Sequence, residues 1–374
     1  MNEDKASRYH RLKRRSAVLS LVVTASVLAV FLMSGASSAL AGVAREITGA
    51  APADFSFLQV ALYVAALAVI QELTAFPLSV YHGFLLERRY GLSAQSLAGW
   101  LRDHLKASAI AFALGLGGAE IVYATLRFTP SSWWLLSSLV FVIVMIVLAK
   151  LAPLVLLPLF YRFRPLARES LRERLVALSR RAGVPVLGVY EWGLGDKTRR
   201  ANAALVGTGG TRRIIVSDTL LAEYTDDEIE VILAHELAHH VHRDIAAAIV
   251  AEAFLLVTAF FVAGTALAVW WQPLGLTAPA DVAGLPLLLL AAGAVSLAAT
   301  PWVNALSRWN ERRADRYALT LTRQPGAFIS AMKRLAAQNL AEEHPSRAVL
   351  WLFHTHPPIA QRIEAARVFQ DQPA

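Results

Sequence analysis

Two histidines and a glutamate form the pattern His-Glu-x-x-His between positions 235 and 239. His235 and His239 are four residues apart, so a helix would place both imidazoles on one face, one turn apart. Two neutral imidazoles in this arrangement can bind one tetrahedral zinc ion, with Glu236 close enough to take a proton from a zinc-bound water. The pattern therefore predicts a metal site with hydrolytic chemistry.

The residues around this motif predict the helix that it requires. Thr225 and Glu228 have the spacing of a capping box, and the acidic residues there lie at the positive end of the helix dipole. Apolar residues surround the histidines, namely Val231, Ile232, Leu233 and Leu237. The alternative is a helix with two solvated histidines beside a glutamate.

A catalytic zinc ion needs a third protein ligand and one open position. The segment 307–315 is predicted to be helical, with Glu311 and Asp315 on one face. Glu311 can bind the metal, and Asp315 can hold a metal-binding imidazole through its other ring nitrogen. The alternative for this segment is an exposed surface helix. We expect one Zn²⁺ per chain.

The composition indicates a membrane protein that contacts the lipid bilayer. Hydrophobic residues make up 56% of the 374 residues, and the mean hydropathy is +0.47. Long apolar runs predict six membrane helices, at about 17–41, 57–80, 107–127, 133–161, 246–271 and 283–305. The run 133–161 contains Pro153 and Pro158, which leaves a seventh span open.

Charge and cysteine content exclude several classes of function. The chain has no cysteine, so disulfides, thiol catalysis and cysteine-bound metals are excluded. The net charge is +8, and no basic patch with interleaved aromatic residues accompanies it. In a membrane protein such a charge indicates positive loops on the inner side, and we expect no nucleic-acid partner.

Lysine and arginine are distributed asymmetrically between the loops. They are concentrated in the loop 82–106 and after the fourth span, whereas the opposite loops contain few. The N-terminus, this loop and the two polar regions 162–245 and 306–374 are therefore expected on the cytoplasmic side. The membrane would be the bacterial inner membrane, or the endoplasmic reticulum in a eukaryote.

The expected fold is mainly α: a polytopic membrane helix bundle with a cytoplasmic α+β zinc-peptidase domain. The predicted regions are an N-terminal membrane domain (1–161), the first part of the peptidase domain (162–245), a transmembrane hairpin (246–305) and the second part (306–374). Within the first polar region we expect a helix over 165–182 and strands at Val186–Leu194 and Arg213–Val216. A glycine-rich turn lies between these strands.

His-Glu-Leu-Ala-His, followed after a hairpin by Glu-Arg-Arg-Ala-Asp, resembles the integral-membrane zinc proteases of the type I CAAX prenyl endopeptidase kind. The resemblance extends from about residue 57 to 366. It includes the segments 76–94 and 214–221 and the motif of His356 with Arg362. The family has seven membrane helices, whereas six are predicted here. In the family an aromatic residue usually follows the position of Asn202, which here precedes alanine.

The resemblance implies roles for particular residues. The implied zinc ligands are His235, His239 and Glu311. Glu236 would be the general base and then the proton donor to the leaving amine. Asn202 would hold an extended substrate, and His356 and Arg362 would stabilise the oxyanion. Taken alone, these three could instead be a turn residue, a residue at a helix start and a solvated arginine.

The resemblance also implies a water-filled chamber enclosed by the helices. Glu72, Glu120 and Glu252 lie inside apolar runs and would line this chamber, because a carboxylate in a membrane is costly unless it faces a cavity. The alternative for Glu72 and Glu252 is a carboxylate that reaches the membrane surface from near a helix end.

These observations predict a membrane zinc metalloendopeptidase acting on membrane-associated or prenylated polypeptides. Whether the substrate is lipidated is open, and a quality-control protease without prenyl specificity is the first alternative. A site-2-type intramembrane protease would need the motif within an apolar span, whereas charged residues such as Asp226 and Asp244 flank it here. A transport-associated protein with structural zinc would need no base at Glu236.

Overall fold

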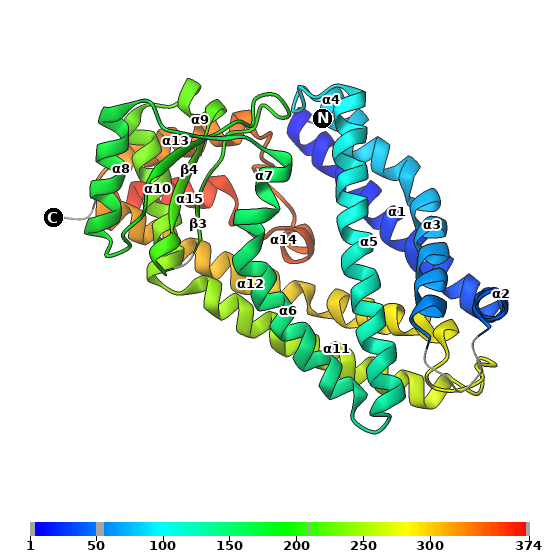
Figure 1. Cartoon of the computed structure of the whole chain (residues 1–374). Coiled ribbons are helices and arrows are strands. Elements are labelled where there is room, and N and C mark those ends of the chain that lie inside the picture. Colours follow the sequence, from blue (N-terminus) through cyan, green and yellow to red (C-terminus); the bar gives the residue numbers. More distant parts are fainter. Residues whose placement is uncertain (1–3, 50–55, 208, 372–374) are drawn as a thin grey trace.

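The computed structural model describes residues 4–49, 56–207 and 209–371 (Figure 1). Six helical segments are long and apolar enough to cross a membrane, as predicted. They are α1 (Lys5–Met33), α3 (Phe57–Val80, continued by the π-helix Tyr81–Leu85 and α4, Leu86–Arg89), α5 (Leu97–Phe128), α6 (Trp133–Val155), α11 (Asp244–Trp270) and α12 (Leu285–Thr322, preceded by η3, Val282–Gly284). The predicted mainly α membrane bundle is therefore confirmed.

The first span differs from the prediction at its C-terminal end. Helix α1 stops at Met33 and not near residue 41, because Gly35 takes a left-handed conformation with φ of 78°. Helix α2 (Ala36–Thr48) then folds against α3. Its 13 residues extend about 20 Å. Since a hydrocarbon core is about 30 Å thick, α2 does not provide a seventh span.

The apolar run 133–161 forms one span and a short extra turn. Helix α6 ends at Val155, and α7 (Leu157–Phe160) follows with Pro158 in its first turn. Proline fits the first turn of a helix, where its missing N–H would have no helical partner, so Pro158 is compatible with the start of α7, whereas Pro153 lies inside α6 without ending it.

A cavity of about 950 Å³ lies among the membrane helices. Residues from α1, α3, α5, α6, α11 and α12 line it, and most of them are apolar. Glu72 is at its wall, where Nε2 of His104 lies 2.6 Å from the carboxylate. Glu120 and Glu252 are absent from the described residues that line this cavity. Of the three carboxylates expected there, the structure thus places only Glu72 at the cavity.

The peptidase domain contains a four-stranded sheet in the order β1-β2-β4-β3. The strands are β1 (Phe163–Pro165), β2 (Val189–Trp192), β3 (Ala203–Val206) and β4 (Arg213–Ser217). Strands β2 and β4 are parallel, and the other two pairs are antiparallel. Since the order ends in β3, this strand lies at one edge of the sheet. The sequence predicted only β2 and β4, since β1 has three residues and the run Ala-Ala-Leu-Val of β3 shows no alternation of apolar and polar residues.

The turn between β3 and β4 requires glycine at one position. Gly207 has φ of 86°, and a Cβ atom there would lie 2.6 Å from the carbonyl oxygen of Thr211. Any other residue would force the turn to move. The turn includes the short 3₁₀ helix η2 (Gly209–Thr211) before β4.

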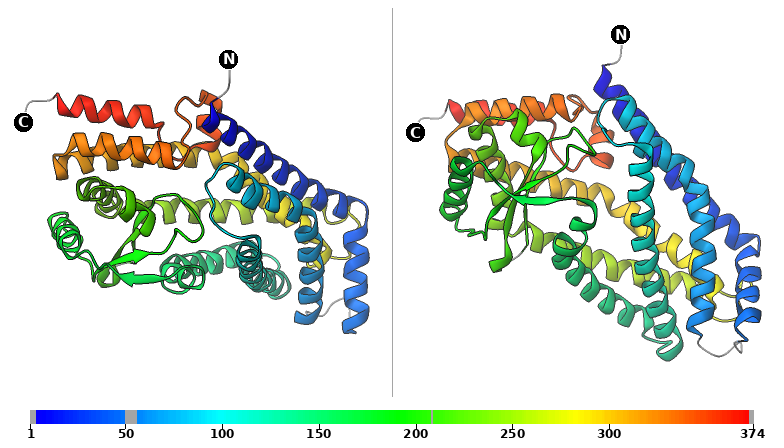
Figure 2. Two further views of the ribbon diagram at one scale, coloured as in Figure 1. Left: turned by 90° about the horizontal axis from the view of Figure 1, so that it is seen from above. Right: turned by 45° about the horizontal axis from the view of Figure 1, so that its top comes forward.

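Helices enclose the core of the peptidase domain beside the sheet. They are α8 (Glu169–Arg181), α9 (Asp218–Glu223), α10 (Asp226–Val241), α13 (Pro325–Gln338), α14 (Arg347–Phe353) and α15 (Ile359–Gln370). The stripe predicted on α8 is buried: Leu171, Leu175 and Leu178 are at most 1% exposed. They share one apolar cluster with residues of β4, α10 and α13. This packing holds α10 rigidly between the sheet and the C-terminal helices (Figure 2).

The membrane bundle and the peptidase domain are joined by backbone pairing and by ion pairs. The backbone of residues 92–94 exchanges hydrogen bonds with residues 197–199. Glu87 binds Lys13 and Arg200, each at 2.8 Å. The start of α1, the loop after α4 and both polar regions therefore lie at the same end of the bundle (Figure 2).

Candidate metal centre

Helices α10 and α12 pack against each other and provide the residues predicted to bind metal. The predicted capping box at Thr225 and Glu228 is present and fixes the start of α10. His235 is on the buried face of α10, and Glu311 is on the facing side of α12, where it is 6% exposed. Burying these polar groups is costly unless they bind one another or an ion.

The three predicted ligands converge on one point. Nε2 of His235 lies 3.2 Å from one carboxylate oxygen of Glu311, and Nε2 of His239 lies 3.5 Å from the other. Ligand atoms about 2.0–2.1 Å from a tetrahedral zinc ion are about 3.3–3.4 Å apart. Both carboxylate oxygens of Glu311 therefore face imidazole nitrogens. The spacing of the three predicted ligand atoms fits a bound divalent ion.

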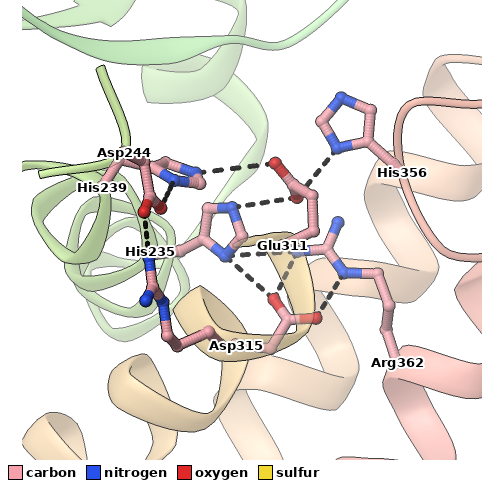
Figure 3. A network of polar contacts seen from close by, with 8 residues as sticks. His235, His239, Asp244, Glu311, Asp315, His356 and Arg362 are labelled. Carbon is pink, nitrogen blue, oxygen red and sulfur yellow. Dashed lines mark hydrogen bonds and ion pairs between the residues drawn. The ribbon is translucent and has the colours of Figure 1, made fainter. Parts of the chain in front are cut away.

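Each imidazole is held through its other ring nitrogen (Figure 3). Nδ1 of His235 lies 2.8 Å from Asp315, and Nδ1 of His239 lies 2.9 Å from Asp244. Both carboxylates therefore leave the Nε2 atoms directed at the shared point. Such outer carboxylates orient metal-binding imidazoles and make them better ligands.

An arginine neutralises each of these carboxylates. Arg362 donates to both oxygens of Asp315, at 2.8 and 2.6 Å, and Arg313 donates to Asp244. The site thus contains two chains of the same type, arginine to aspartate to histidine. Because each buried carboxylate is paired on both sides, the imidazoles cannot turn without breaking a charged hydrogen bond.

Asp244 is a site residue that sequence reasoning missed. In the sequence it is only one of the charged residues that flank the motif. Arg243 takes a left-handed conformation with φ of 58°, which changes the direction of the chain between α10 and α11, and Asp244 contacts His239. The sequence does contain a signal, an aspartate five residues after a predicted metal ligand. That spacing brings the two side chains together only because of the turn at Arg243, which the sequence did not predict.

Electrostatics favour a proton on His235 and on Glu236 when no cation is bound. Burial alone would lower the pKa of His235, but its hydrogen bonds to Asp315 and Glu311 raise it to about 10. A metal ion that binds Nε2 would have to displace this proton, so metal binding should weaken at low pH. Burial also raises the pKa of the Glu236 carboxyl above its ordinary value.

Glu236 and the other predicted catalytic residues line a cleft of about 360 Å³. His356 is largely exposed, and its Nδ1 lies 2.8 Å from Glu311. Two nitrogens of Arg362 bind Asp315, while the third points toward the side where His356 lies (Figure 3). The roles predicted for His356 and Arg362 at an oxyanion stay predictions.

Arg308 of α12 fixes the chain that leads to His356. Its guanidinium donates to the carbonyl oxygens of Leu350 and His354, at 2.8 and 2.6 Å. Asn304, one turn earlier, donates to the carbonyl oxygen of Trp351. The helix that provides Glu311 therefore also holds α14 and the start of the His356 segment.

Asn202 lies at the cleft immediately before the edge strand β3. Its backbone exchanges hydrogen bonds with Ser217 of β4, and its side chain is exposed. The opposite edge of β3 faces α10, where His240 donates to the carbonyl oxygen of Leu205. An edge strand beside a cleft can pair with an extended peptide. The predicted role of Asn202 is compatible with this position and stays a prediction.

The fold and this site define an integral-membrane metallopeptidase. Residues 165–369 match the model of peptidase family M48, and residues 2–162 match the model described as CAAX prenyl protease N-terminal, five membrane helices. The first match covers more than half of the 374 residues. The chain belongs to peptidase family M48 and is a zinc metallopeptidase.

Known proteins resemble most of the chain. The Bacillus subtilis (strain 168) protein named "Uncharacterized metalloprotease YhfN" is 30% identical over 351 residues, which are 92% of this chain and 80% of that protein. CAAX prenyl protease 1 of Saccharomyces cerevisiae is 29% identical over 182 residues, 47% of this chain and 39% of that protein. The crystal structure of S. mikatae Ste24p superposes with a TM-score of 0.83 at 21% identity, covering 97% of this chain and 87% of that one, and supports the fold.

We predict that Asp244→Asn weakens zinc binding by roughly 10- to 100-fold, because His239 loses the carboxylate that orients it. Competition with a chromophoric chelator would measure this directly. Asp227→Asn is the matched control, since Asp227 is an exposed aspartate that pairs with Arg174 at the surface. Equal zinc affinity of Asp244→Asn and wild type would show that Asp244 does not support the ligand.

Proposed function

We propose that the chain is a zinc endopeptidase that hydrolyses peptide bonds of membrane-associated polypeptides, with one Zn²⁺ bound by His235, His239 and Glu311. The observation that carries this proposal is the convergence of three ligand atoms in a cleft that also contains a buried glutamate, Glu236. A purely structural metal site would need no such acid or base beside it.

The metal, when bound, would polarise the scissile carbonyl and lower the pKa of water. Glu236 would accept the proton of the attacking water and then transfer it to the leaving amine. The raised pKa of Glu236 suits both steps, because a carboxylate of higher pKa is a stronger base and keeps the proton until the amine needs it.

The remaining predicted residues would bind the substrate and stabilise charge. Backbone groups near Asn202 and along β3 would pair with an extended substrate. His356 and the third nitrogen of Arg362 would donate hydrogen bonds to the oxygen that becomes negative. Asp315 would keep His235 in the orientation that ligation needs.

Two membrane helices contribute residues to the cleft, which supports the proposal that the substrate is membrane-associated. The ligand Glu311 is on the same unbroken helix as the sixth span, and His10 of α1 lines the cleft. A prenylated substrate is the narrower hypothesis, which rests on the name of the yeast relative, and general membrane-protein processing is the broader one. The motif helix α10 is outside the six candidate spans, which disfavours a site-2-type mechanism.

We predict that Glu236→Gln abolishes peptide hydrolysis but retains the metal, because it removes a base and no ligand. Hydrolysis of membrane-associated peptides and zinc content would be measured on the same preparation of full-length protein. Glu223→Gln, an exposed change at the end of α9, is the matched control. If Glu236→Gln keeps its activity, the assignment of the base is wrong.

We further propose that the N-terminus and both parts of the peptidase domain face the cytoplasm, because positive loops are retained there. Reporter fusions near residues 165 and 370 should give cytoplasmic signals, and a fusion near residue 277 should give the opposite signal. Opposite locations for the fusions at 165 and 370 would contradict the structure itself. If all three fusions gave the opposite signals, only the proposed orientation in the membrane would be contradicted.

A further inference from the structure

One wall of the active-site cleft is polar but takes no part in the proposed mechanism. The cavity that contains His235 and Glu236 continues past the metal site. We use the name polar wall for four residues that line it there: His10, Asn339, Glu342 and His354. Polar groups placed in a substrate cleft usually fix the orientation and identity of what binds.

Helix α1, the loop after α13 and His354 at the end of α14 build the polar wall together. Nε2 of His10 lies 2.7 Å from the carbonyl oxygen of Leu340. Arg14, one turn further along α1, binds both carboxylate oxygens of Glu342, at 2.5 and 3.3 Å. These contacts join residues more than 320 positions apart, so the wall exists only where the first membrane helix meets the peptidase domain.

The loop that carries Asn339 and Glu342 is held in a strained conformation. Leu340 has φ of 51°, which is unusual for a residue with a branched side chain. Its side chain packs against a buried cluster that includes Tyr9 and Leu86. Strain of this kind persists only where surrounding contacts enforce it, and it is concentrated at binding and catalytic sites.

The polar wall offers mainly hydrogen-bond acceptors. Oδ1 of Asn339 is buried and has no hydrogen-bond partner within the part of the chain that the structure describes. Because the Leu340 carbonyl can only accept, Nε2 of His10 carries the proton, and Nδ1 of the neutral ring is an acceptor. The Glu342 carboxylate also faces the cleft, but Arg14 binds both of its oxygens and Nε2 of His354 lies 3.5 Å from one of them, so the Asn339 oxygen is the acceptor without a partner among the described residues. A matching ligand group would therefore donate hydrogen bonds.

We propose that the polar wall is a side-chain subsite that selects substrate residues with N–H donors, lysine and arginine above all. This inference rests on the proposed peptidase function and adds a residue preference to it. A substrate ammonium or guanidinium group would satisfy the buried oxygen of Asn339 and approach the Glu342 carboxylate. An apolar residue of equal length would leave the Asn339 oxygen unpaired. This penalty should contribute more to discrimination than the attraction to Glu342, whose charge Arg14 balances.

The test compares peptides that differ only by lysine or norleucine at one position, scanned along the substrate, with the full-length protein in lipid nanodiscs. At one position we expect lysine to raise kcat/KM by roughly 10- to 100-fold over norleucine. Asn339→Leu should remove this preference, because it should lower kcat/KM for the lysine peptide toward that for the norleucine peptide. Asn339→Asp should strengthen it. His344→Leu, an exposed change outside the cleft, should leave it unaltered, and unchanged thermal midpoints would exclude misfolding.

Binding of the same peptides to Glu236→Gln separates this inference from the proposed function. Lysine-selective binding without any cleavage by wild type would contradict the peptidase function and support the subsite. Cleavage and binding that do not distinguish lysine from norleucine at any position would overturn the subsite and leave the peptidase function intact. A lysine preference that survives in Asn339→Leu would also overturn it.

Discussion

The arrangement of the site depends on the packing of α12 against α10. Helix α12 continues without a break for 38 residues, about 57 Å, nearly twice the thickness of a hydrocarbon core. Its half beyond the membrane buries Glu311 and Asp315 on one face, toward α10. Buried carboxylates are tolerated only when paired, and both are paired with α10 here. A rotation of α12 would separate every one of these pairs, so the rotation of a membrane helix fixes the metal centre.

This constraint makes the bundle and the peptidase domain one functional unit. The face of α12 that provides the ligand also positions the His356 segment through Arg308. Helix α1 reaches the opposite side of the cleft, where His10 and Arg14 hold the loop after α13. The proposed substrate cleft therefore has a membrane helix on each side. A protease built in this way can act on a chain at the membrane surface without drawing it into bulk water.

Residue spacing predicted which side chains the structure brings together at the candidate metal centre, but not all of the residues that hold them. His235, His239, Glu311 and Asp315 could be named because helical periodicity places them on two faces and few other arrangements use those residue types. Asp244 could not, since its role depends on the left-handed turn at Arg243. Six spans followed from hydropathy, whereas β1 has only three residues and β3 has no alternation of apolar and polar residues. The place of His10 in the cleft depends on a contact 330 residues away in sequence, which no local signal encodes.

The central claim is that two imidazoles and one carboxylate bind a single zinc ion and leave one position open. X-ray absorption spectroscopy at the zinc edge on the purified full-length protein tests it most directly. The account predicts two imidazole ligands, with all first-sphere nitrogen and oxygen atoms at about 2.0–2.1 Å and total coordination of four or five. The spectrum of His356→Ala should be the same. A third imidazole that disappears in His356→Ala would contradict the account, because the position needed by the reacting water would then be closed.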